Sequence, residues 1–432
     1  MWPREGLWRH RDFLSLWGAE TVSQFGSQIT FLALPLVAIL VLDESAFRVA
    51  ALTSVYFLPF LLLTLPAGVW VDRLRRRPIL VIGDLVRAVA LLTIPLAHWA
   101  DVLTIWQLYV VAFVTGVGTV FFDVAYQSYL PALVGRDQVV DGNSKLEISR
   151  AAASVGGPGL GGLLVSALTA PVAILTDAIS FLVSALLLGS IRKQEDAPPR
   201  EERRSLRAEL SEGLRYVFTH RYQRGMVAST AIANFFGQVV FSILIVYAVR
   251  ELDLTAGMIG LIITIGSLGT FGGALSARRI SDRLGVGRTI ALAAFMFGPA
   301  TLLIGLAPKD IAIPLIVVSM LILTFGGVLY NITAISLIQA ITPDRILGRA
   351  NASRRFVVWG VIPLGALVGG ALASAIGLRE TMIVGAIGGS LAFVPILLSP
   401  VRSVGRMSEV ELETVAPAEP QSPIASASSA QA

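Results

Sequence analysis

Polar side chains recur at helical spacing inside otherwise apolar stretches of this sequence. Glu20, Gln24 and Gln28 follow one another at intervals of four residues, so a helix would carry them on one slowly drifting face. Asn234 and Gln238 repeat this spacing in the second half of the chain. Because a charge at the centre of a bilayer costs roughly 2.5–3.5 kcal/mol, such side chains usually face a bundle interior or a cavity. The pattern predicts a polar cavity that binds a small-molecule solute. Three further residues are candidates for the same lining: Tyr126, Tyr330 and Asn331.

Two acids in these stretches are candidates for proton exchange. Glu20 lies about 10 Å from the nearer end of its predicted helix, at 1.5 Å per residue. A buried carboxyl at that depth can bind and release a proton; the alternative is a carboxylate paired with an arginine or reached by water. Asp123 shares its depth with three charged residues of the next predicted helix: Lys145, Glu147 and Arg150. We expect an ion-pair cluster there, with a proton site as the alternative.

The other ionisable residues of the apolar stretches suggest structural roles. Asp84 and Arg87 have the i, i+3 spacing of a local ion pair, and Asp177 is expected near the outer end of its helix as a capping or gating acid. The chain has no cysteine, and none of its three histidines lies in the middle of an apolar stretch. No lysine follows a glycine, so the Gly-Lys of a phosphate-binding loop is missing. We therefore expect no cofactor, no metal site and no enzymatic activity.

The composition places these residues in a membrane protein. Of the 432 residues, 55% are hydrophobic and 15% are charged, against roughly 45–50% and 25% in soluble domains. A helix needs about 20 apolar residues to cross the hydrocarbon core, and unpaired backbone groups cannot face lipid. The sequence predicts an all-α polytopic membrane protein with twelve transmembrane helices. They are expected at 13–42, 48–70, 79–98, 103–130, 144–168, 172–190, 225–249, 256–280, 288–307, 311–338, 355–376 and 380–399.

The distribution of basic residues indicates the orientation. With the N-terminus inside, the outer loops hold only four of the 34 lysines and arginines: Arg48, Arg250, Lys309 and Arg379. This bias predicts cytoplasmic N- and C-termini in a bacterial-type cytoplasmic membrane. The expected parts are a six-helix bundle at 1–190, a charged cytoplasmic linker at 191–222, a second six-helix bundle at 223–400 and a disordered tail at 401–432. We expect a monomer that contacts the lipid bilayer and no nucleic acid.

The two halves look like copies of each other at an offset of about 208–211 residues. Asp72-Arg73, after the second predicted helix, corresponds to Asp282-Arg283 after the eighth. Gly161-Gly162 corresponds to Gly369-Gly370. Matches in one register indicate a duplication. Two repeated bundles place a binding site at their interface, near the bilayer midplane.

The motifs on these helices resemble those of a known family. Gly68, Asp72, Arg73, Arg76 and Arg77 form the pattern GxxxDRxxRR. With twelve predicted helices and a long inner linker, the chain resembles the major facilitator superfamily. Arg75 departs from the pattern, because relatives usually have glycine there.

A second motif narrows the resemblance. Gly157, Pro158, Gly161 and Gly162 belong to the run GPGLGG, which is similar to the GPxxGG antiporter motif of that superfamily and implies export. The segments around residues 129–162 and 341–370 resemble the branch of macrolide, enterobactin and secondary-metabolite exporters. Ser27 stands where many relatives carry an acid, so the resemblance does not support a proton site on the first predicted helix.

The resemblance implies a role for each motif. The loop at Asp72 and its copy at Asp282 are expected in the inner gate; the alternative is a basic loop that only fixes orientation. The GPGLGG run is expected to bend its helix at Pro158 and to bring two helices close together. The expected function is proton-coupled efflux of an amphipathic antibiotic, secondary metabolite or siderophore by alternating access. The alternatives are uptake or lipid flipping on the same fold, or a receptor or assembly subunit that does not transport.

Overall fold

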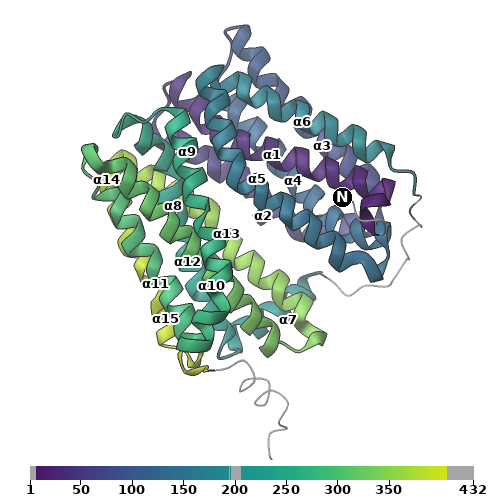
Figure 1. The fold of residues 1–432 in the computed structure, drawn as a ribbon, viewed down its shortest axis with the longest axis vertical. Helices are drawn as coiled ribbons and strands as arrows, with labels where there is room; N and C mark the ends of the chain where they lie inside the picture. The colour runs from purple at the N-terminus through teal and green to yellow at the C-terminus, as the bar shows by residue number, and fades with distance from the viewer. Residues whose placement is uncertain (1–5, 194, 196–205, 406–432) are drawn as a thin grey trace, which may run out of the picture.

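Helices form all the regular structure in the part of the chain that the computed structural model describes, residues 6–193, 195 and 206–405 (Figure 1). The first bundle contains α1 (Arg11–Leu40), α2 (Ala46–Arg73), α3 (Arg76–Trp99), α4 (Ile105–Val134), α5 (Val139–Ala167) and α6 (Ala170–Ser190). The second contains α8 (Gln223–Arg250), α9 (Ala256–Ser267), α10 (Gly269–Leu284), α11 (Val286–Gly305), α12 (Ala312–Ile341), α13 (Asp344–Ile376), α14 (Leu378–Ser390) and α15 (Val394–Leu397). Helix α7 (Leu206–Thr219) lies between the bundles in sequence. Short 3-10 helices occur at Leu7–Arg9, Arg136–Gln138, Lys309–Ile311, Leu391–Phe393 and Pro400–Ser403. Residues 406–432, most of the predicted tail, lie outside the described residues.

The membrane spans agree with the predicted fold class. Eleven stretches of the described residues are long and apolar enough to cross a membrane. Two of them are interrupted helices: α9 is followed directly by α10, and α14 continues through a 3-10 turn into α15. Helix α5 is not among these eleven, but its 29 residues rise about 43 Å at 1.5 Å per residue, which is long enough for a twelfth span. The prediction of an all-α protein with twelve transmembrane helices is confirmed.

The two bundles pack their helices in the same way. In the first bundle α1 packs on α5 and α6, as α8 packs on α13 and α14 in the second. Helix α3 contacts α4 and α6, and its counterpart α11 contacts α12 and α14. Between the bundles, α2 packs on α13 and α5 packs on α9, so each bundle offers the same two positions to the other. Figure 1 shows α2, α5 and α13 in the middle of the molecule, where the purple-to-teal half meets the green-to-yellow half.

The bundles are joined at one end of the molecule and separate at the other. We call the end at which α6 leads towards α7 the linker end, and the opposite one the far end. The largest apolar cluster takes residues from both bundles near the far end, such as Leu36 and Val49 of the first and Val246 and Ile259 of the second. Towards the linker end each described cluster belongs to one bundle only. Apolar burial therefore stabilises contact between the bundles at the far end.

Two turns at the far end repeat the duplication in three dimensions. Asp43, between α1 and α2, has a φ of 47°, and Asp253, between α8 and α9, has a φ of 56°. Aspartate tolerates this left-handed conformation better than most residues. Two residues later, the side chains of Ser45 and Thr255 cap the next helix by accepting a hydrogen bond from the backbone N–H three residues on. The two turns are related by the same offset as Asp72 and Asp282.

The loops after α2 and α10 follow different paths. Gly285 ends α10 with a φ of 85°, a conformation that favours glycine. At the equivalent place after α2, Arg75 has a φ of −66° and a ψ of 131°, which any residue can adopt. The first loop therefore does not require the glycine that the motif usually has.

Candidate functional site

A cavity of about 600 Å³ lies in the second bundle between α8, α11, α12 and α13. Four predicted lining residues are on its wall: Asn234, Gln238, Tyr330 and Asn331. The Tyr330 hydroxyl is 2.8 Å from the Thr230 hydroxyl, and Asn234 donates from Nδ2 to the Val358 carbonyl at 2.9 Å. These bonds tie polar side chains of α8 to α12 and α13. The cavity wall is therefore braced by hydrogen bonds between helices as well as by packing.

The cavity also contains two residues that the sequence analysis did not single out, Arg354 and Arg355. The predicted span begins at residue 355, so both arginines count there as charges at an inner helix end. Helix α13 begins at Asp344 instead, which places them three turns into the helix. The sequence feature that could have identified them is a pair of consecutive arginines followed directly by an apolar run.

The predicted lining residues of the first bundle lie outside this cavity. Gln24 donates from Nε2 to Glu20 Oε1 at 2.9 Å. Gln28 packs with its β and γ carbons close to Gly157 of α5. Tyr126 is buried and stacks on Phe122, with ring centroids 6.3 Å apart. The Gln24 amide, the Gln28 carbons and the Tyr126 ring thus make contacts within the first bundle, although the spacing of Gln24 and Gln28 on one face of α1 is as predicted.

Glu20 is a buried carboxylate with a partner on another helix. Its side chain is 3% exposed, and Oε1 lies 3.5 Å from Nη2 of Arg150 on α5. The second oxygen, Oε2, is buried and has no hydrogen-bond partner among the described residues. Arg150 also pairs with Glu147 at 3.1 Å, and that acid is exposed. This is the arginine-paired arrangement given above as the alternative, and proton exchange at Glu20 remains a prediction.

The prediction of an ion-pair cluster around Asp123 is wrong. Among the described residues Asp123 forms no ion pair, because the basic residues of α5 are already paired. Lys145 pairs with Asp141 one turn earlier on its own helix, and Arg150 takes its two acids. The charged groups that act on Asp123 come from four helices: Glu20, Arg87, Arg150 and Arg355. Asp123 is thus a half-buried acid that feels charges of both bundles.

The predicted local pair of Asp84 and Arg87 is confirmed, and it is fully buried. The two side chains form an ion pair on α3 and are 0% and 5% exposed. The guanidinium group lies between two aromatic rings, with Cζ 4.6 Å from the centroid of Phe122 and 4.2 Å from that of Phe181. Arg87 therefore connects α3 to α4 and α6 through cation–π contacts as well as charge.

The predicted capping role of Asp177 is wrong, because the residue lies two turns into α6, and its gating role remains a prediction. Asp177 is 1% exposed on α6, and it accepts hydrogen bonds from the hydroxyls of Thr30 on α1 and Ser180 on α6. A β carbon at Gly26 would clash with the side chains of Asp177 and Ser180. The missing side chain of Gly26 lets α1 approach the acid. The rotation of α6 turns Asp177 into the bundle, and an estimate of depth along the helix does not give that rotation.

The arginines of the gate motif bind the end of α6. Arg76 lies 3.6 Å from Glu195, and the backbone N–H of Arg77 donates to Glu195 Oε2 at 3.0 Å. The Arg77 side chain donates to the carbonyls of Leu188 and Gly189. Arg73 is exposed, and the side chain of Asp72 lies outside the described residues. These contacts hold the loop to its own bundle in this state.

The copy of the gate motif in the second bundle is exposed. Asp282 lies 3.7 Å from Arg278, one turn earlier on α10, and both side chains are largely in solvent. Arg283 is exposed as well. Gly68, at the start of the first motif, has open space where a β carbon would be. The gating role of both loops remains a prediction.

The GPGLGG run contacts two helices in two bundles. Gly157 and Gly161 face α1, where an added β carbon would lie close to Gln28 and Ile29. Gly162 faces α9 of the second bundle, where an added β carbon would be 2.6 Å from the Ala256 carbonyl oxygen. The predicted close approach of helices is present. Helix α5 continues through Pro158, and the predicted bend there remains a prediction.

The equivalent glycines of α13 make equivalent contacts. Gly369 faces Val239 on α8, the first helix of its own bundle, as Gly161 faces α1. Gly370 faces Phe47 and Ala50 on α2 of the other bundle, as Gly162 faces α9. Small residues let helices of a membrane protein approach closely. The duplicated glycines thus form two matching contacts between the bundles.

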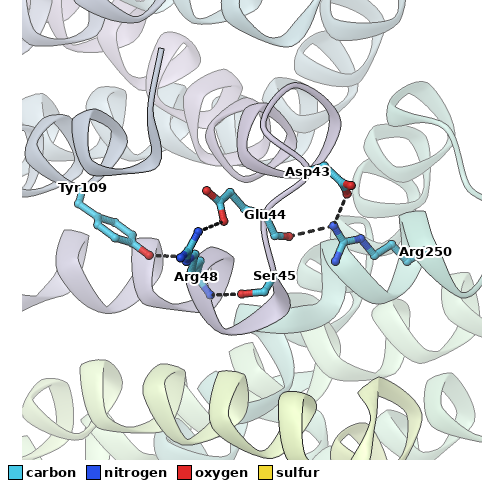
Figure 2. Close-up of polar contacts among 6 residues, drawn as sticks. All are labelled: Asp43, Glu44, Ser45, Arg48, Tyr109 and Arg250. Carbon is cyan, nitrogen blue, oxygen red and sulfur yellow. Dashed lines mark hydrogen bonds and ion pairs between the residues drawn. The ribbon is translucent and has the colours of Figure 1, made fainter. Parts of the chain in front are cut away.

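Polar contacts also join the bundles at the far end (Figure 2). Arg250, at the end of α8, lies 2.8 Å from Asp43 Oδ1 and donates to the Glu44 carbonyl at 2.9 Å. Beside them, Arg48 pairs with Glu44 at 2.8 Å within the first bundle, and the Tyr109 hydroxyl donates to the Arg48 carbonyl at 3.0 Å. The far end is therefore closed by charge as well as by apolar packing.

The sequence is similar to those of known transport proteins. It matches the model of the Major Facilitator Superfamily over residues 16–351 and 227–427. It is 28% identical over 373 residues to the multidrug efflux pump Tap of Mycolicibacterium fortuitum, covering 83% of this chain and 88% of that protein. It is 22% identical over 389 residues to macrolide efflux protein A of Streptococcus pyogenes, covering 85% of this chain and 91% of that protein.

The fold is also that of solved transporters. The nucleoside transporter NupG superposes with a TM-score of 0.73 over 90% of this chain and 99% of its own, at 12% sequence identity. Identity this low shows a shared fold, and the nucleoside specificity belongs to NupG.

Proposed function

Because the chain belongs to the Major Facilitator Superfamily, we propose that it exports an amphipathic small molecule in exchange for protons by alternating access. The observation that carries this proposal is a cavity of about 600 Å³ in a molecule whose bundles meet at the far end and are separate towards the linker end. A protein in this state takes up substrate from the linker side. Two of the similar proteins are efflux proteins by name, which supports export.

The proposed orientation puts the linker end in the cytoplasm of a bacterial-type inner membrane. Thirty of the 34 lysines and arginines are expected on that side, and positive charge favours the cytoplasmic side of a membrane. Both termini are then cytoplasmic. Substrate enters from the cytoplasm and leaves after the far end has opened.

The proposed motion is a rocking of the bundle in residues 1–190 against the bundle in residues 223–400. The linker at 191–222 connects them. The matching contacts of α2 with α13 and of α5 with α9 are the surfaces on which the bundles turn. The contacts at Asp43 and Arg250 must break when the far end opens.

Glu20 is the residue that we propose binds the exchanged proton. One of its oxygens contacts Arg150 and Gln24, while the other is buried without a hydrogen-bond partner among the described residues. Leaving a carboxylate oxygen unpaired is costly, and a proton would remove that cost. Movement of α5 that withdraws Arg150 would favour the protonated form. Asp123 is the second candidate, because it has no ion-pair partner among the described residues and feels charges of both bundles.

The test begins with a susceptibility and accumulation screen across drug classes in cells that express the chain. Any compound found there is then followed in everted vesicles with an imposed pH gradient. We expect Glu20→Gln to lose at least ten-fold of the gradient-driven accumulation, because the group that exchanges the proton is missing. Counterflow of substrate without a gradient should persist in this variant.

The matched control is Glu147→Gln. Glu147 pairs with the same Arg150, and its side chain is 66% exposed. We expect this variant to accumulate substrate like the wild type. Full gradient-driven accumulation by Glu20→Gln would remove Glu20 from the mechanism, and absence of counterflow by the wild type would favour a receptor over a transporter.

A further inference from the structure

The cavity of the second bundle carries two positive charges and, among the described residues that line it, no acid. Arg354 and Arg355 are adjacent on α13 and are half-buried. Neither forms an ion pair with a described residue. The Nε atom of Arg354 is buried and has no hydrogen-bond partner among these residues. Arg355 Cζ lies 4.8 Å from the ring centroid of Trp359, one turn further along the helix.

The duplicated architecture does not require this pair of charges. At the offset that relates Gly161 to Gly369, the first-bundle counterparts of Arg354 and Arg355 are Leu146 and Glu147. Two arginines within the first bundle have nearby acids, since Arg87 pairs with Asp84 and Arg150 with Glu20. Unpaired charge within a membrane span is costly and usually marks a functional position. The two arginines are therefore expected to bind an anionic group that the described residues do not supply.

The chemistry around the arginines defines that partner. A guanidinium group presents a planar fork of N–H donors that fits carboxylate, sulfonate or phosphate oxygens. The amides of Asn234 and Gln238 add polar contacts, and the rings of Phe241, Phe297 and Trp359 offer apolar surface. A ligand that matches this wall has one anionic group and a larger apolar or aromatic body.

We propose that the cavity binds amphipathic anions, with the anionic group held by Arg354 and Arg355 and the apolar body against the aromatic side chains. This inference rests on the proposed function, because it takes the cavity as the substrate site. It narrows the substrate class from amphipathic molecules in general to those that carry a carboxylate, phenolate, sulfonate or phosphate.

An internal partner is the competing explanation. Asp123 of α4 is an acid close enough to feel the charge of Arg355, after those of Glu20, Arg87 and Arg150. Closure of the linker end could bring Asp123 and Arg355 together. In that case the arginines neutralise Asp123 and select no anion. Asp123→Asn separates the two explanations. If the arginines bind an anionic ligand, this variant keeps or strengthens that binding. If they serve only to neutralise Asp123, the wild type and the variant bind no anion selectively.

The test measures equilibrium binding of two dyes to the purified full chain in nanodiscs of neutral lipid. Fluorescein and rhodamine 123 share a xanthene core that carries a phenyl ring. The ring has a free carboxylate in fluorescein, which is an anion, and a methyl ester in rhodamine 123, which is a cation. We expect fluorescein to bind at least ten-fold more tightly, by fluorescence anisotropy. Arg354→Gln and Arg355→Gln should each weaken fluorescein binding about ten-fold, while Asp123→Asn should keep or strengthen it.

Matched variants keep the result interpretable. Arg349→Gln removes an arginine of the same helix that pairs with Glu212 outside the cavity, and it should bind fluorescein like the wild type. Arg354→Lys and Arg355→Lys keep the charge and should retain part of the affinity if a Gln variant does not fold. Equal or tighter binding of rhodamine 123, no binding of fluorescein, or unchanged fluorescein affinity in both Gln variants would overturn the proposal. Because binding is measured without a proton gradient, anion-selective binding without transport would refute the export proposal alone.

Discussion

At the scale of single residues, the acids of the first bundle differ in what holds them. Asp84 has an arginine on its own helix, and Glu20 has one on a neighbouring helix. The hydrogen-bond donors to Asp177 within the described ranges are two hydroxyl groups. Asp123 has no ion-pair partner within the described part of the chain. Asp84 and Glu20 each have one buried carboxylate oxygen without a hydrogen-bond partner among the described residues, so this feature does not distinguish them. The arginine that pairs with Asp84 lies on the same helix and moves with it, whereas Arg150 can leave Glu20 when α5 moves. We therefore expect Asp84 to be structural and propose proton exchange only for Glu20 and Asp123.

Arg87→Gln tests the structural class. The change leaves the Asp84 carboxylate buried without its counter-charge, which typically costs about 3–5 kcal/mol. We expect a clear fall in the melting temperature of the purified protein. The double variant Arg87→Gln with Asp84→Asn should recover part of the loss, because no charge is then left unpaired.

An ion pair with one exposed partner provides the control for this prediction. Arg48 and Glu44 form an ion pair at the far end, and the Arg48 side chain is 56% exposed. Glu44 is 13% exposed, but its partner reaches solvent, so Arg48→Gln should lower the melting temperature much less than Arg87→Gln. If the Arg87→Gln and Arg48→Gln variants have the same melting temperature, the buried pair does not stabilise the bundle as we argue.

At the scale of helices, small residues determine where the bundles meet. Gly162 and Gly370 occupy equivalent positions on α5 and α13. Gly162 faces α9 and Gly370 faces α2, which are the second helices of the two bundles. In both places the nearest atoms include backbone, which cannot move aside as a side chain can. The sequence run GPGLGG marks only one of these contacts, but the repeat offset identifies the other.

Gly162→Val should open the far end. The added carbons would meet the Ala256 carbonyl and the Gly260 α carbon, so α5 and α9 must separate. Because the chain has no cysteine, spin labels can be attached at Val102→Cys and Ile311→Cys, two exposed positions of the far end in different bundles. Double electron–electron resonance should report a larger population of long label-to-label distances in the variant than in its parent.

Gly348→Val is the matched control on α13. An added β carbon at Gly348 has no heavy atom within 4 Å, so the same substitution should leave the label distances unchanged. Identical distance distributions for Gly162→Val and its parent would show that the close contact does not hold the far end closed.

At the scale of the whole molecule, the state described here is set by what joins the bundles. The shared apolar cluster, the two glycine contacts and the pair of Arg250 with Asp43 all lie between the bundles or at the far end. Exposed ion pairs contribute roughly 0.2–1 kcal/mol. The pair at Asp43 therefore adjusts the equilibrium between states, while apolar burial supplies most of the stabilisation.

Arg250→Gln should shift that equilibrium modestly. The change removes contacts to both the Asp43 carboxylate and the Glu44 carbonyl. A loss of up to about 1 kcal/mol corresponds to a shift of up to about five-fold towards the state with an open far end. The populations can be read with the same pair of spin labels, and Asp43→Asn, which keeps the carbonyl contact, should give a smaller shift.

Arg48→Gln serves again as the comparison, because its partner Glu44 is in the same bundle. It should not change the label populations, since no contact across the interface is lost. A shift as large as that of Arg250→Gln would mean that loop structure, rather than the pair across the interface, controls opening.

The sequence by itself determined the fold class, the number of spans and the family. Hydrocarbon thickness sets the length of each apolar stretch, and the duplicated residues repeat in one register, so neither inference needs a contact between helices. It also found the local pair of Asp84 and Arg87, since residues three apart on a helix must be neighbours.

Only the tertiary structure decided which partner each polar residue has. The rotation of a helix about its axis depends on how it packs against its neighbours. That rotation turned Asp177 towards Thr30 and left Asp123 without the basic residues of α5. The start of α13 at Asp344 brought Arg354 and Arg355 into the cavity, although hydropathy placed them at a helix end. Polar residues lower the hydropathy at the edge of a span, and packing against the rest of the bundle keeps the chain helical there.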